Sequence, residues 1–353
     1  MKIATIVGAR PQFIKAAPVS RVLRKYHNEI LIHTGQHYDK NMSDIFFDEL
    51  DIPRPDYNLN VGSGPHGKQT GEMLIKIEEV LVREKPDAVI VYGDTNSTLA
   101  GALAASKLLI SVIHVEAGLR SYNKKMPEEQ NRVLTDHISS ILFCPTKTAV
   151  ENLMKEGITN NVFNVGDVMY DAILFNLDIA ERKSNILSQL QLKKNEYILA
   201  TVHRAENTDT YENLYNIIHS FNDSQELIVF LVHPRTRKAM QDYGIKLSNN
   251  VKVIDPVGYL DMIILEKYAN KIVTDSGGIQ KEAFILGVPC ITLRHETEWV
   301  ETVKDKWNIL VGTDKEKIIE AIKCFWPSNM RGNYFGEGKA GEKIVDVINH
   351  ILK

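Results

Sequence analysis

Three acidic residues stand where carboxylates could act as acids and bases. Asp94 and Glu116 each follow a short apolar run, 88–92 and 111–115, and Glu128 follows Pro127 at the expected start of a helix. The carboxyl ends of parallel strands meet at one edge of a sheet, so we expect Asp94 and Glu116 to converge there. Carboxylates crowded together provide a usable acid or base near neutral pH. The pattern therefore predicts proton-transfer chemistry at this edge.

Each acid also has a purely structural alternative. Asp94 could cap the helix that begins near Thr95, Glu116 could pair with Arg120, and Glu128 could respond to the helix dipole with Arg132 as an ion-pair partner. These alternatives weaken when the three acids are considered together.

A histidine from the second half of the chain is the expected partner of these acids. His203 ends the run 197–202 in the sequence Thr-Val-His-Arg-Ala-Glu-Asn. An imidazole at a strand end can donate a hydrogen bond or a proton to a departing phosphate. The alternative is a structural histidine. His33 and His37 have HxxxH spacing but straddle a strand end, so we expect no metal site there.

Two loops have the composition of anion-binding turns. In the first, Gly8 permits a tight turn and Arg10 would stand beside free backbone N–H groups, although an ordinary turn with a solvated arginine is an equal alternative. The second loop, Ser276-Gly277-Gly278, opens a helix and is the stronger signal. Glu282, one turn into that helix, could accept hydrogen bonds from a ribose diol. Together the loops predict a nucleotide diphosphate in a cleft between two domains.

The elements that must position these residues repeat with one rhythm in each half. Short β-branched runs alternate with amphipathic stretches, the pattern of a doubly wound parallel α/β sheet. The expected strands are 2–7, 29–34, 88–92, 111–115, 141–144 and 162–165 in the first half, and 197–202, 227–232, 251–254, 271–274 and 290–293 in the second. We expect a Rossmann-like domain over 1–170, a second one over 171–335, and a C-terminal helix at 336–353 that packs on another element. The chain has no GxGxxG or GxxxxGK[ST] motif, so the nicotinamide and P-loop interpretations lose their main support.

Composition narrows the class of protein further. The 353 residues carry a net charge of -3 with 25% charged residues, without the excess of one sign that marks nucleic-acid or membrane-surface binders. The three cysteines are widely spaced, and no run of 18 uncharged apolar residues occurs. We expect a cytoplasmic protein that binds neither nucleic acid nor membranes.

In order along almost the whole chain, several motifs resemble those of the non-hydrolysing UDP-N-acetylglucosamine 2-epimerases. They are Gly8-Ala9-Arg10-Pro11-Gln12-Phe13-Ile14-Lys15, Thr34-Gly35-Gln36-His37, Gly93-Asp94-Thr95, His114-Val115-Glu116-Ala117-Gly118-Leu119-Arg120, Pro127-Glu128-Glu129, His203-Arg204 and Asp275-Ser276-Gly277-Gly278.

The resemblance implies a GT-B architecture, a homodimer and inversion at C2 of a UDP-2-acetamido sugar. UDP would leave to give a glycal and then add back, with no metal or redox cofactor. By motif position, three residues of this chain resemble the family's acid/base set: Asp94, Glu116 and Glu128. His203 corresponds to the family's histidine that assists the departure of UDP. The nucleotide contacts correspond to Arg10, Lys15, Ser276, Gly277, Gly278 and Glu282.

Several positions depart from the family pattern. Ala9 and Gln12 stand where many members have Thr and Glu, and Trp299 replaces an arginine contact. Met262 stands where the family has an aromatic residue near the uracil, and Ile45 stands where a glutamine of its allosteric site is expected, so that activation is in doubt.

The departures resemble a branch that includes UDP-2,3-diacetamido-uronate 2-epimerases of lipopolysaccharide synthesis. The substrate is therefore UDP-N-acetylglucosamine or this diacetamido-uronate relative. A GT-B glycosyltransferase, a hydrolysing 2-epimerase and a non-catalytic nucleotide-sugar sensor are the alternatives from other classes.

Overall fold

The computed structural model describes residues 1–36, 47 and 54–352, and it divides into two compact units. Unit 1 comprises Met1–Phe175 and Asn333–Lys353, and unit 2 comprises Asn176–Gly332. The chain thus passes from one unit to the other twice, within a helix after Phe175 and again after Gly332. The domain boundaries expected from the sequence are at residues 170 and 335.

Unit 1 is built on a seven-stranded parallel sheet in the order β3-β2-β1-β4-β5-β6-β7. All of these strands are expected from the sequence except β3, which has only two residues. The strands are β1 (Lys2–Val7), β2 (Asn28–His33), β3 (Tyr57–Asn58), β4 (Ala88–Tyr92), β5 (Ser111–Val115), β6 (Ile141–Cys144) and β7 (Val162–Asn164).

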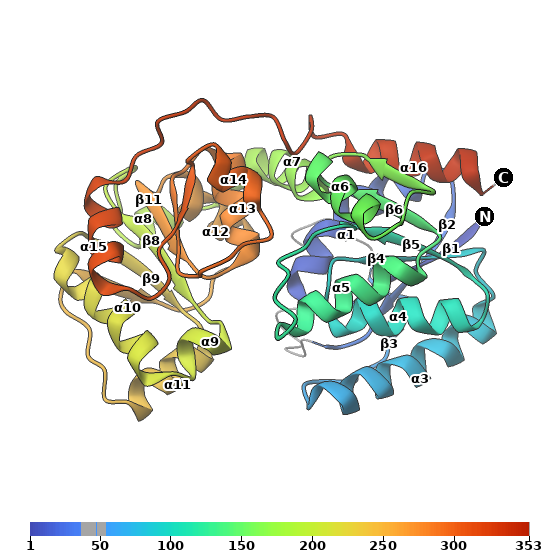
Figure 1. Ribbon diagram of the computed structural model, residues 1–353, viewed down its shortest axis with the longest axis horizontal. Helices are drawn as coiled ribbons and strands as arrows, with labels where there is room; N and C mark the ends of the chain where they lie inside the picture. The colour runs from blue at the N-terminus through green and yellow to red at the C-terminus, as the bar shows by residue number, and fades with distance from the viewer. Residues whose placement is uncertain (37–46, 48–53, 353) are drawn as a thin grey trace. The chain divides into compact units, whose positions relative to one another are not determined.

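Helices cover both faces of this sheet. Figure 1 shows the sheet between a layer with α1 and α16 and a layer with α3 and α4. The helices of unit 1 are α1 (Arg10–Leu23), α3 (His66–Glu84), α4 (Asn96–Lys107), α5 (Pro127–Ile138), α6 (Lys147–Lys155), α7 (Val168–Lys183), which continues into unit 2, and α16 (Ala340–Ile351).

Unit 2 has a six-stranded parallel sheet in the order β10-β9-β8-β11-β12-β13. Counted from its first strand, this is the 3-2-1-4-5-6 order of a Rossmann fold. Its strands are β8 (Ile198–Val202), β9 (Ile228–Val232), β10 (Val251–Ile254), β11 (Lys271–Thr274), β12 (Cys290–Thr292) and β13 (Asn308–Leu310).

The helices of unit 2 alternate with these strands. They are α8 (Ile186–Gln189), α9 (Ala205–Thr208), α10 (Tyr211–Ser224), α11 (Pro234–Asp242), α12 (Tyr259–Lys267), α13 (Gly277–Leu286), α14 (Val300–Lys304) and α15 (Lys315–Cys324). The two α/β units confirm the fold class expected from the sequence. Among the described residues, no helix combines the length and the apolar character needed to cross a membrane.

Small side chains let α4 lie close to the sheet beneath it. Ala100 and Ala104 are fully buried, and a Cβ added to Gly101 would come within 2.7 Å of Ile6 Cδ1. The helix begins with a capping box in which Thr95 accepts from Thr98 N–H. Thr95, rather than Asp94, is therefore the helix cap, and the Asp94 side chain is available for other contacts.

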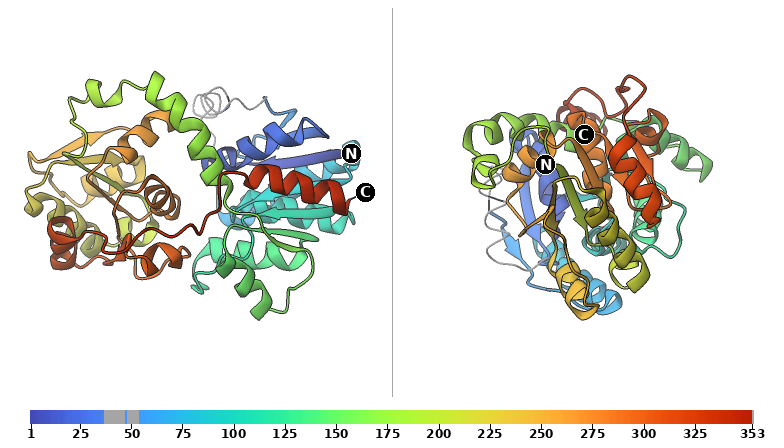
Figure 2. Two further views of the ribbon diagram at one scale, coloured as in Figure 1. Left: turned by 90° about the horizontal axis from the view of Figure 1, so that it is seen from above. Right: turned by 90° about the vertical axis from the view of Figure 1, so that its left-hand side faces the viewer.

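The C-terminal helix is fastened to unit 1 through its first turn. The carboxylate of Asp171 on α7 accepts from Ala340 N and Gly341 N at 3.1 and 2.8 Å, and α16 packs along α1 (Figure 2). A Cβ on Gly341 would lie only 2.8 Å from the carbonyl oxygen of Pro18. Glycine is thus required where the two helices approach most closely.

The Gly341→Ala variant should therefore be less stable by about 1–3 kcal/mol, because the added methyl group overpacks the α1–α16 contact. Gly71→Ala is the matched control, since Gly71 lies in α3 with nothing within 4 Å of its Cβ position. That control should gain about 0.5–1 kcal/mol from helix propensity. Urea unfolding measures both, and equal stability of the two variants would contradict the packing described.

Candidate active site

The predicted site residues follow strands at or next to the point where the strand order of each sheet reverses. In unit 1 the order reverses between β1 and β4, and in unit 2 between β8 and β11. Open α/β sheets bind ligands beyond the carboxyl ends of strands at this switch point. Asp94 follows β4 and Glu116 follows its neighbour β5, while His203 follows β8 and Ser276 follows β11.

Asp94 forms an ion pair with an arginine on α5. Arg132 Nη2 lies 2.5 Å from Asp94 Oδ2, and Arg132 Nη1 donates to Glu129 Oε2 at 2.9 Å. Asn131 Nδ2 also donates to the backbone carbonyl of Asp94 at 3.0 Å. The second turn of α5 thus holds both the side chain and the backbone of Asp94, whose carboxylate remains partly exposed.

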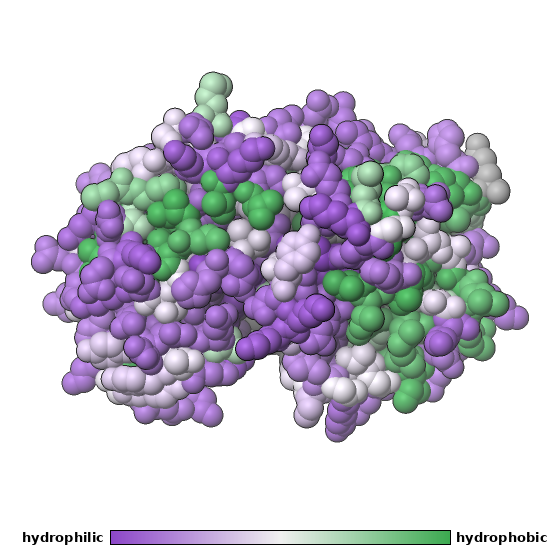
Figure 3. Space-filling view, in the orientation of Figure 1, coloured by the Kyte–Doolittle hydropathy of each residue, from purple (hydrophilic) through white to green (hydrophobic). Residues whose placement is uncertain are grey.

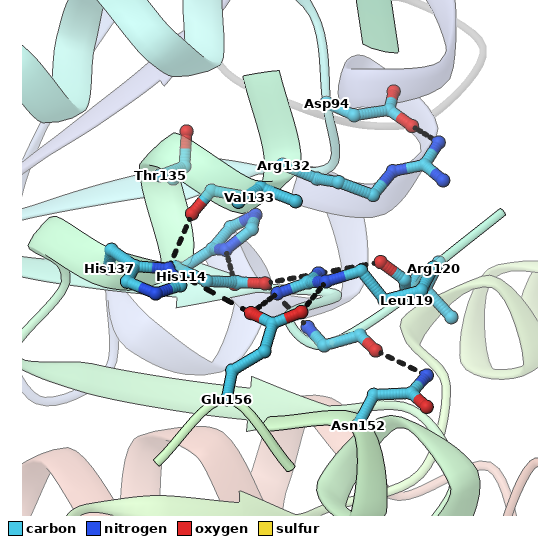
Figure 4. A network of polar contacts seen from close by, with 12 residues as sticks. Asp94, His114, Leu119, Arg120, Arg132, Val133, Thr135, His137, Asn152 and Glu156 are labelled. Atoms are coloured by element: carbon cyan, nitrogen blue, oxygen red, sulfur yellow. Dashed lines mark hydrogen bonds and ion pairs between the residues drawn. The ribbon is translucent and has the colours of Figure 1, made fainter. Parts of the chain in front are cut away.

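Glu116 pairs with Lys15 of α1. Both side chains are largely buried, at 5% and 12% exposure. Glu116 has φ +72°, so the chain turns at this residue and the carboxylate leaves the strand direction of β5. Such a backbone is costly for a residue with a Cβ, and it is found preferentially at functional sites. Arg120, the expected alternative partner of Glu116, instead pairs with Asp136 and Glu156 (Figure 4).

Gly93 separates the two ion pairs. It has φ +63°, and a Cβ built on it would lie 2.9 Å from Lys15 Nζ and 3.1 Å from Glu116 Oε2. The Lys15–Glu116 pair therefore packs closely against the backbone of Gly93, which is the residue before Asp94. The two acids come from adjacent strands as predicted, but each has its own cation.

Glu128 is the least constrained of the predicted acids. It lies in the first turn of α5 and is partly exposed, and across the described residues its carboxylate has no hydrogen bond or ion pair. The expected partner Arg132 is turned toward Asp94 and Glu129 instead.

The first loop does not offer all the free N–H groups expected from its sequence. Gln12 Oε1 accepts from Gly8 N and Ala9 N at 2.9 and 3.0 Å, and Gln12 Nε2 donates to Tyr92 O and Thr98 Oγ1 at 3.0 Å each. An amide suits this position because it must both accept and donate. The expectation of free N–H groups here was wrong for Gly8 and Ala9. The Arg10 side chain lies outside the described residues.

In unit 2, a buried aspartate joins the two switch-point loops. Asp275, which is fully buried, accepts from His203 N, Arg204 N and Asn207 Nδ2 at 3.0–3.1 Å. His203 Nδ1 lies 3.3 Å from Asp275 Oδ1, and the His203 ring is 41% exposed. Asp275 thus orients the imidazole and leaves much of the ring accessible.

The Ser-Gly-Gly loop forms the N-terminus of α13, as predicted. Ser276 is the helix cap and accepts from Ile279 N–H at 3.4 Å. A Cβ on Gly277 would collide with Glu298 Oε1 at 2.1 Å, whereas the Cβ position of Gly278 faces open space with only Ser276 Oγ at 3.8 Å. Glu282 lies one turn further along α13 and is buried, at 6% exposure.

These two glycines provide a matched pair of variants. If a diphosphate approaches the open side of Gly278, Gly278→Ala should weaken UDP binding by about 10-fold or more and leave stability almost unchanged. Gly277→Ala should instead lower stability, since Glu298 must move. Calorimetric titration with UDP and thermal unfolding distinguish the two effects. Unchanged UDP affinity in Gly278→Ala would show that no ligand approaches this face.

Two of the residues that depart from the family pattern, Trp299 and Met262, are buried in unit 2. Trp299 is 3% exposed, and Lys281 Nζ lies 4.2 Å from the centre of its ring, a cation–π contact. Met262 is buried on α12. His37 and Ile45, noted in the sequence, lie outside the described residues. The described part of the chain contains no group of three or more His, Cys, Asp or Glu that could hold a metal ion.

Two important residues were under-valued by sequence reasoning. Arg132 was considered only as a partner of Glu128, and Asp275 only as the end of a strand. Both lie within the quoted motif segments or within four residues of them, so their position was a usable signal. Their partners, Asp94 and His203, are distant in sequence and could not be deduced from spacing.

Comparisons with known proteins show which family the chain belongs to. A model of the family "UDP-N-acetylglucosamine 2-epimerase" matches residues 22–349. A Methanococcus maripaludis UDP-N-acetylglucosamine 2-epimerase homolog is 64% identical, over 99% of this chain and 100% of its own. A Pseudomonas aeruginosa UDP-2,3-diacetamido-2,3-dideoxy-D-glucuronate 2-epimerase is 50% identical, over 99% of each chain.

A solved structure gives the same result. Methanocaldococcus jannaschii UDP-GlcNAc 2-epimerase, in complex with UDP-GlcNAc and UDP, has a TM-score of 0.94 and 52% identity, over 99% of this chain and 100% of its own. Fold and site thus define a GT-B-like α/β protein with two Rossmann-like units. The chain belongs to the UDP-N-acetylglucosamine 2-epimerase family, whose members are epimerases of UDP-sugars.

Proposed function

We propose that this protein is a non-hydrolysing UDP-N-acetylglucosamine 2-epimerase that interconverts UDP-GlcNAc and UDP-ManNAc. The observation that carries the proposal is the pair of carboxylates at the ends of β4 and β5. Asp94 and Glu116 follow adjacent strands, flank Gly93 and each contact a separate cation. Inversion at C2 needs proton transfer on both faces of the sugar, and this arrangement supplies two acids for it.

The proposed reaction proceeds by elimination and re-addition. A carboxylate takes the C2 proton, the C–H electron pair forms the C1–C2 double bond, and the C1–O bond breaks with its electrons leaving on UDP. The products of this half-reaction are 2-acetamidoglucal and UDP. An acid then protonates C2 on the opposite face while a UDP oxygen bonds again to C1. UDP leaves and returns, so the sequence needs no metal or redox cofactor.

The described contacts fit distinct roles in this sequence. Lys15 and Arg132 each hold one of the two carboxylates in place, Glu116 and Asp94 respectively. With Glu128, these residues make up the proposed acid/base set. His203, oriented by Asp275, assists the leaving diphosphate as negative charge grows on it.

The nucleotide contacts are proposed for the loops of both units. Ser276, Gly277 and Gly278 at the start of α13 would bind the diphosphate, and Glu282 would accept from the ribose hydroxyls. Arg10 and Lys15 would complete the anion site from unit 1. The place of Ser276 as the cap of α13 and the open Cβ position of Gly278 support this assignment.

A second substrate has specific support. The P. aeruginosa relative, which is half identical over the whole chain, acts by its name on UDP-2,3-diacetamido-2,3-dideoxy-D-glucuronate. The same elimination and re-addition would invert C2 of that sugar in lipopolysaccharide synthesis. Incubation with each UDP-sugar, followed by NMR of the C2 signal, decides between the two. A glycosyltransferase or a hydrolysing 2-epimerase would instead need an acceptor or release free ManNAc.

A homodimer and a cytoplasmic location are proposed as well. Unit 1 exposes large apolar side chains on and beside α3, α4 and α5, where Figure 3 shows hydrophobic residues gathered: Ile75, Val82, Leu109 and Leu134. Leu109 is 94% exposed. Such a patch is suited to a subunit interface. Light scattering should give twice the chain mass, and a monomer would contradict the dimer.

The proposed cytoplasmic location is supported by the cysteines. Cys144, Cys290 and Cys324 are free thiols, as in a reducing compartment.

A further inference from the structure

A network of buried ionisable side chains lies next to the turn that carries Asp94. His114, on β5, is fully buried, and each of its ring nitrogens is 2.7 Å from an oxygen atom. Nδ1 faces Asp136 Oδ1, on α5, and Nε2 faces the backbone carbonyl of Gly93. No role in the proposed reaction has yet been given to this histidine.

The partners determine how many protons the imidazole carries. The Gly93 carbonyl can only accept, so Nε2 must hold a proton. Burial alone would raise the pKa of Asp136, but His114 and Arg120 outweigh burial and the pKa lies below its usual value. Apart from His114, Arg120 Nη1 and Gly118 N both donate to Asp136 Oδ2, so Asp136 is a carboxylate, and a carboxylate only accepts. With an acceptor at both nitrogens, His114 is an imidazolium.

The surrounding charges balance this cation. Arg120 Nη1 donates to Asp136 Oδ2 at 2.7 Å, and the same guanidinium meets Glu156 through Nε and Nη2 at 2.6 and 2.7 Å (Figure 4). Gly118 N also donates to Asp136 Oδ2 at 3.1 Å. Two cations and two carboxylates therefore form one network, which offsets the cost of burying each charge.

The network ends at the backbone on which the proposed acids depend. The Gly93 carbonyl belongs to the peptide group that joins Gly93 to Asp94. Gly93 N donates to Val115 O at 3.0 Å, and the Lys15–Glu116 pair rests on the Cα of Gly93. A shift of this peptide would redirect Asp94 and disturb the contact beneath Lys15–Glu116. A displacement of about 1 Å in a catalytic geometry can cost about 100-fold in rate.

We propose that His114 is a positioning residue, held as an imidazolium by Asp136, which fixes the Gly93–Asp94 peptide and thereby aligns Asp94 with Glu116. The inference rests on the proposed function for its kinetic consequences. Its protonation claim is independent of that function. Asp136 is joined in this network by Arg120 and Glu156. The neighbouring titratable and charged groups of the described chain include the following: Cys144 on β6, the Lys15–Glu116 pair beyond Gly93, Asp94, and Glu129, Arg132 and His137 on α5.

The first experiment measures protonation directly in the unmodified protein. In protein labelled with 15N-histidine, the two ring nitrogens of His114 should both show resonances of protonated nitrogen from pH 6 to pH 8.5. His114→Gln identifies the resonances by their disappearance. A neutral ring, with one unprotonated nitrogen at pH 7, would overturn the proposal whether or not the protein is an epimerase.

The second experiment tests the positioning role by kinetics. In Asp136→Asn, the amide can still hydrogen-bond Nδ1, but the anion that stabilises the second ring proton is lost. A neutral imidazole then holds the Gly93 carbonyl by a weaker hydrogen bond than an imidazolium does. We expect kcat about 10- to 100-fold lower with KM changed less than about threefold, and partial recovery as the pH is lowered. A merely structural role would give a loss without this acid recovery.

Two substitutions at 114 and one control complete the test. His114→Gln, which keeps an N–H donor, should retain more activity than His114→Leu. His137→Gln is the matched control, because His137 is half-exposed at the edge of the same network, 3.9 Å from Glu156, and kcat should be unchanged. Unaltered kcat in His114→Leu, or equal loss in the two variants at 114, would overturn the positioning role. If the wild-type protein shows no epimerisation, the proposed function fails. The NMR result still tests whether both ring nitrogens of His114 carry a proton.

Discussion

The Asp94→Asn variant is expected to lose C2 epimerisation by about 10²- to 10⁴-fold, the range typical of removing a general acid or base. Asparagine keeps the shape of the side chain and can still accept from Arg132 Nη2, so the ion-pair geometry is largely preserved. The carboxylate that would accept or deliver the C2 proton is lost. Glu116→Gln should have an effect of the same size, since Lys15 can still donate to the amide oxygen.

The measurement is the rate of C2 inversion by NMR, together with UDP affinity by calorimetry. UDP affinity should change by less than about threefold in both variants. Asp223→Asn and Glu84→Gln are matched controls, because each removes the charge of a carboxylate that pairs with a cation, here Lys315 and Lys2. These controls lie at the C-terminal ends of α10 and α3, at the edge of each sheet opposite the strand ends that carry the site. Full activity in Asp94→Asn and Glu116→Gln would show that these carboxylates are not the acid/base pair of the reaction.

The His203→Ala variant is expected to lower kcat by about 10²- to 10³-fold with little change in UDP affinity. The reason is that the imidazole is needed most when the C1–O bond breaks and negative charge grows on UDP. Asp275 holds the backbone N–H groups of His203 and Arg204 by separate hydrogen bonds, so the loop should keep its shape when the ring is removed. The side chain is already 41% exposed, and stability should change little.

Steady-state kinetics and calorimetric titration with UDP separate the two possible effects. His203→Gln, which retains a donor, should recover part of the rate. His219→Ala is the control, since His219 lies on the α10 surface stacked on Tyr215. A variant that loses UDP affinity and keeps kcat would show that His203 serves ground-state binding instead.

Much of the fold could be predicted from the sequence because parallel strands buried on both faces appear as uninterrupted β-branched runs. Lys2–Val7, Ala88–Tyr92 and Ser111–Val115 have the bounds expected for them. The two strands that escaped detection, β3 and β13, have two and three residues at the edges of their sheets. Segments this short carry no periodicity, and only the neighbouring strand defines them.

The side-chain partners in the candidate site were harder to predict. Local reasoning paired Glu116 with Arg120 and Glu128 with Arg132, because residues four apart on one element are the partners that a sequence reveals. In the structure, Lys15 reaches Glu116 from α1 and Arg132 reaches Asp94 from α5. These contacts depend on strand order, which brings β1, β4 and β5 together at the switch point.

Gln12 shows the same limitation for backbone groups. Its side chain occupies N–H groups of Gly8 and Ala9 that a turn sequence alone leaves free. The amide also joins this loop to the end of β4 through Tyr92 O. A departure from the family pattern is thus explained by hydrogen bonding across the sheet, which the sequence around the loop does not contain.

The most direct test of the account is to incubate the protein with UDP-GlcNAc in D2O and follow C2 by NMR. Elimination and re-addition predict deuterium at C2 in both UDP-GlcNAc and UDP-ManNAc, with no accumulation of free sugar. UDP-2,3-diacetamido-2,3-dideoxy-glucuronate in a parallel sample would show whether the diacetamido sugar is the better substrate. Absence of deuterium at C2 with either compound, or release of free ManNAc with UDP, would contradict the proposed non-hydrolysing epimerase.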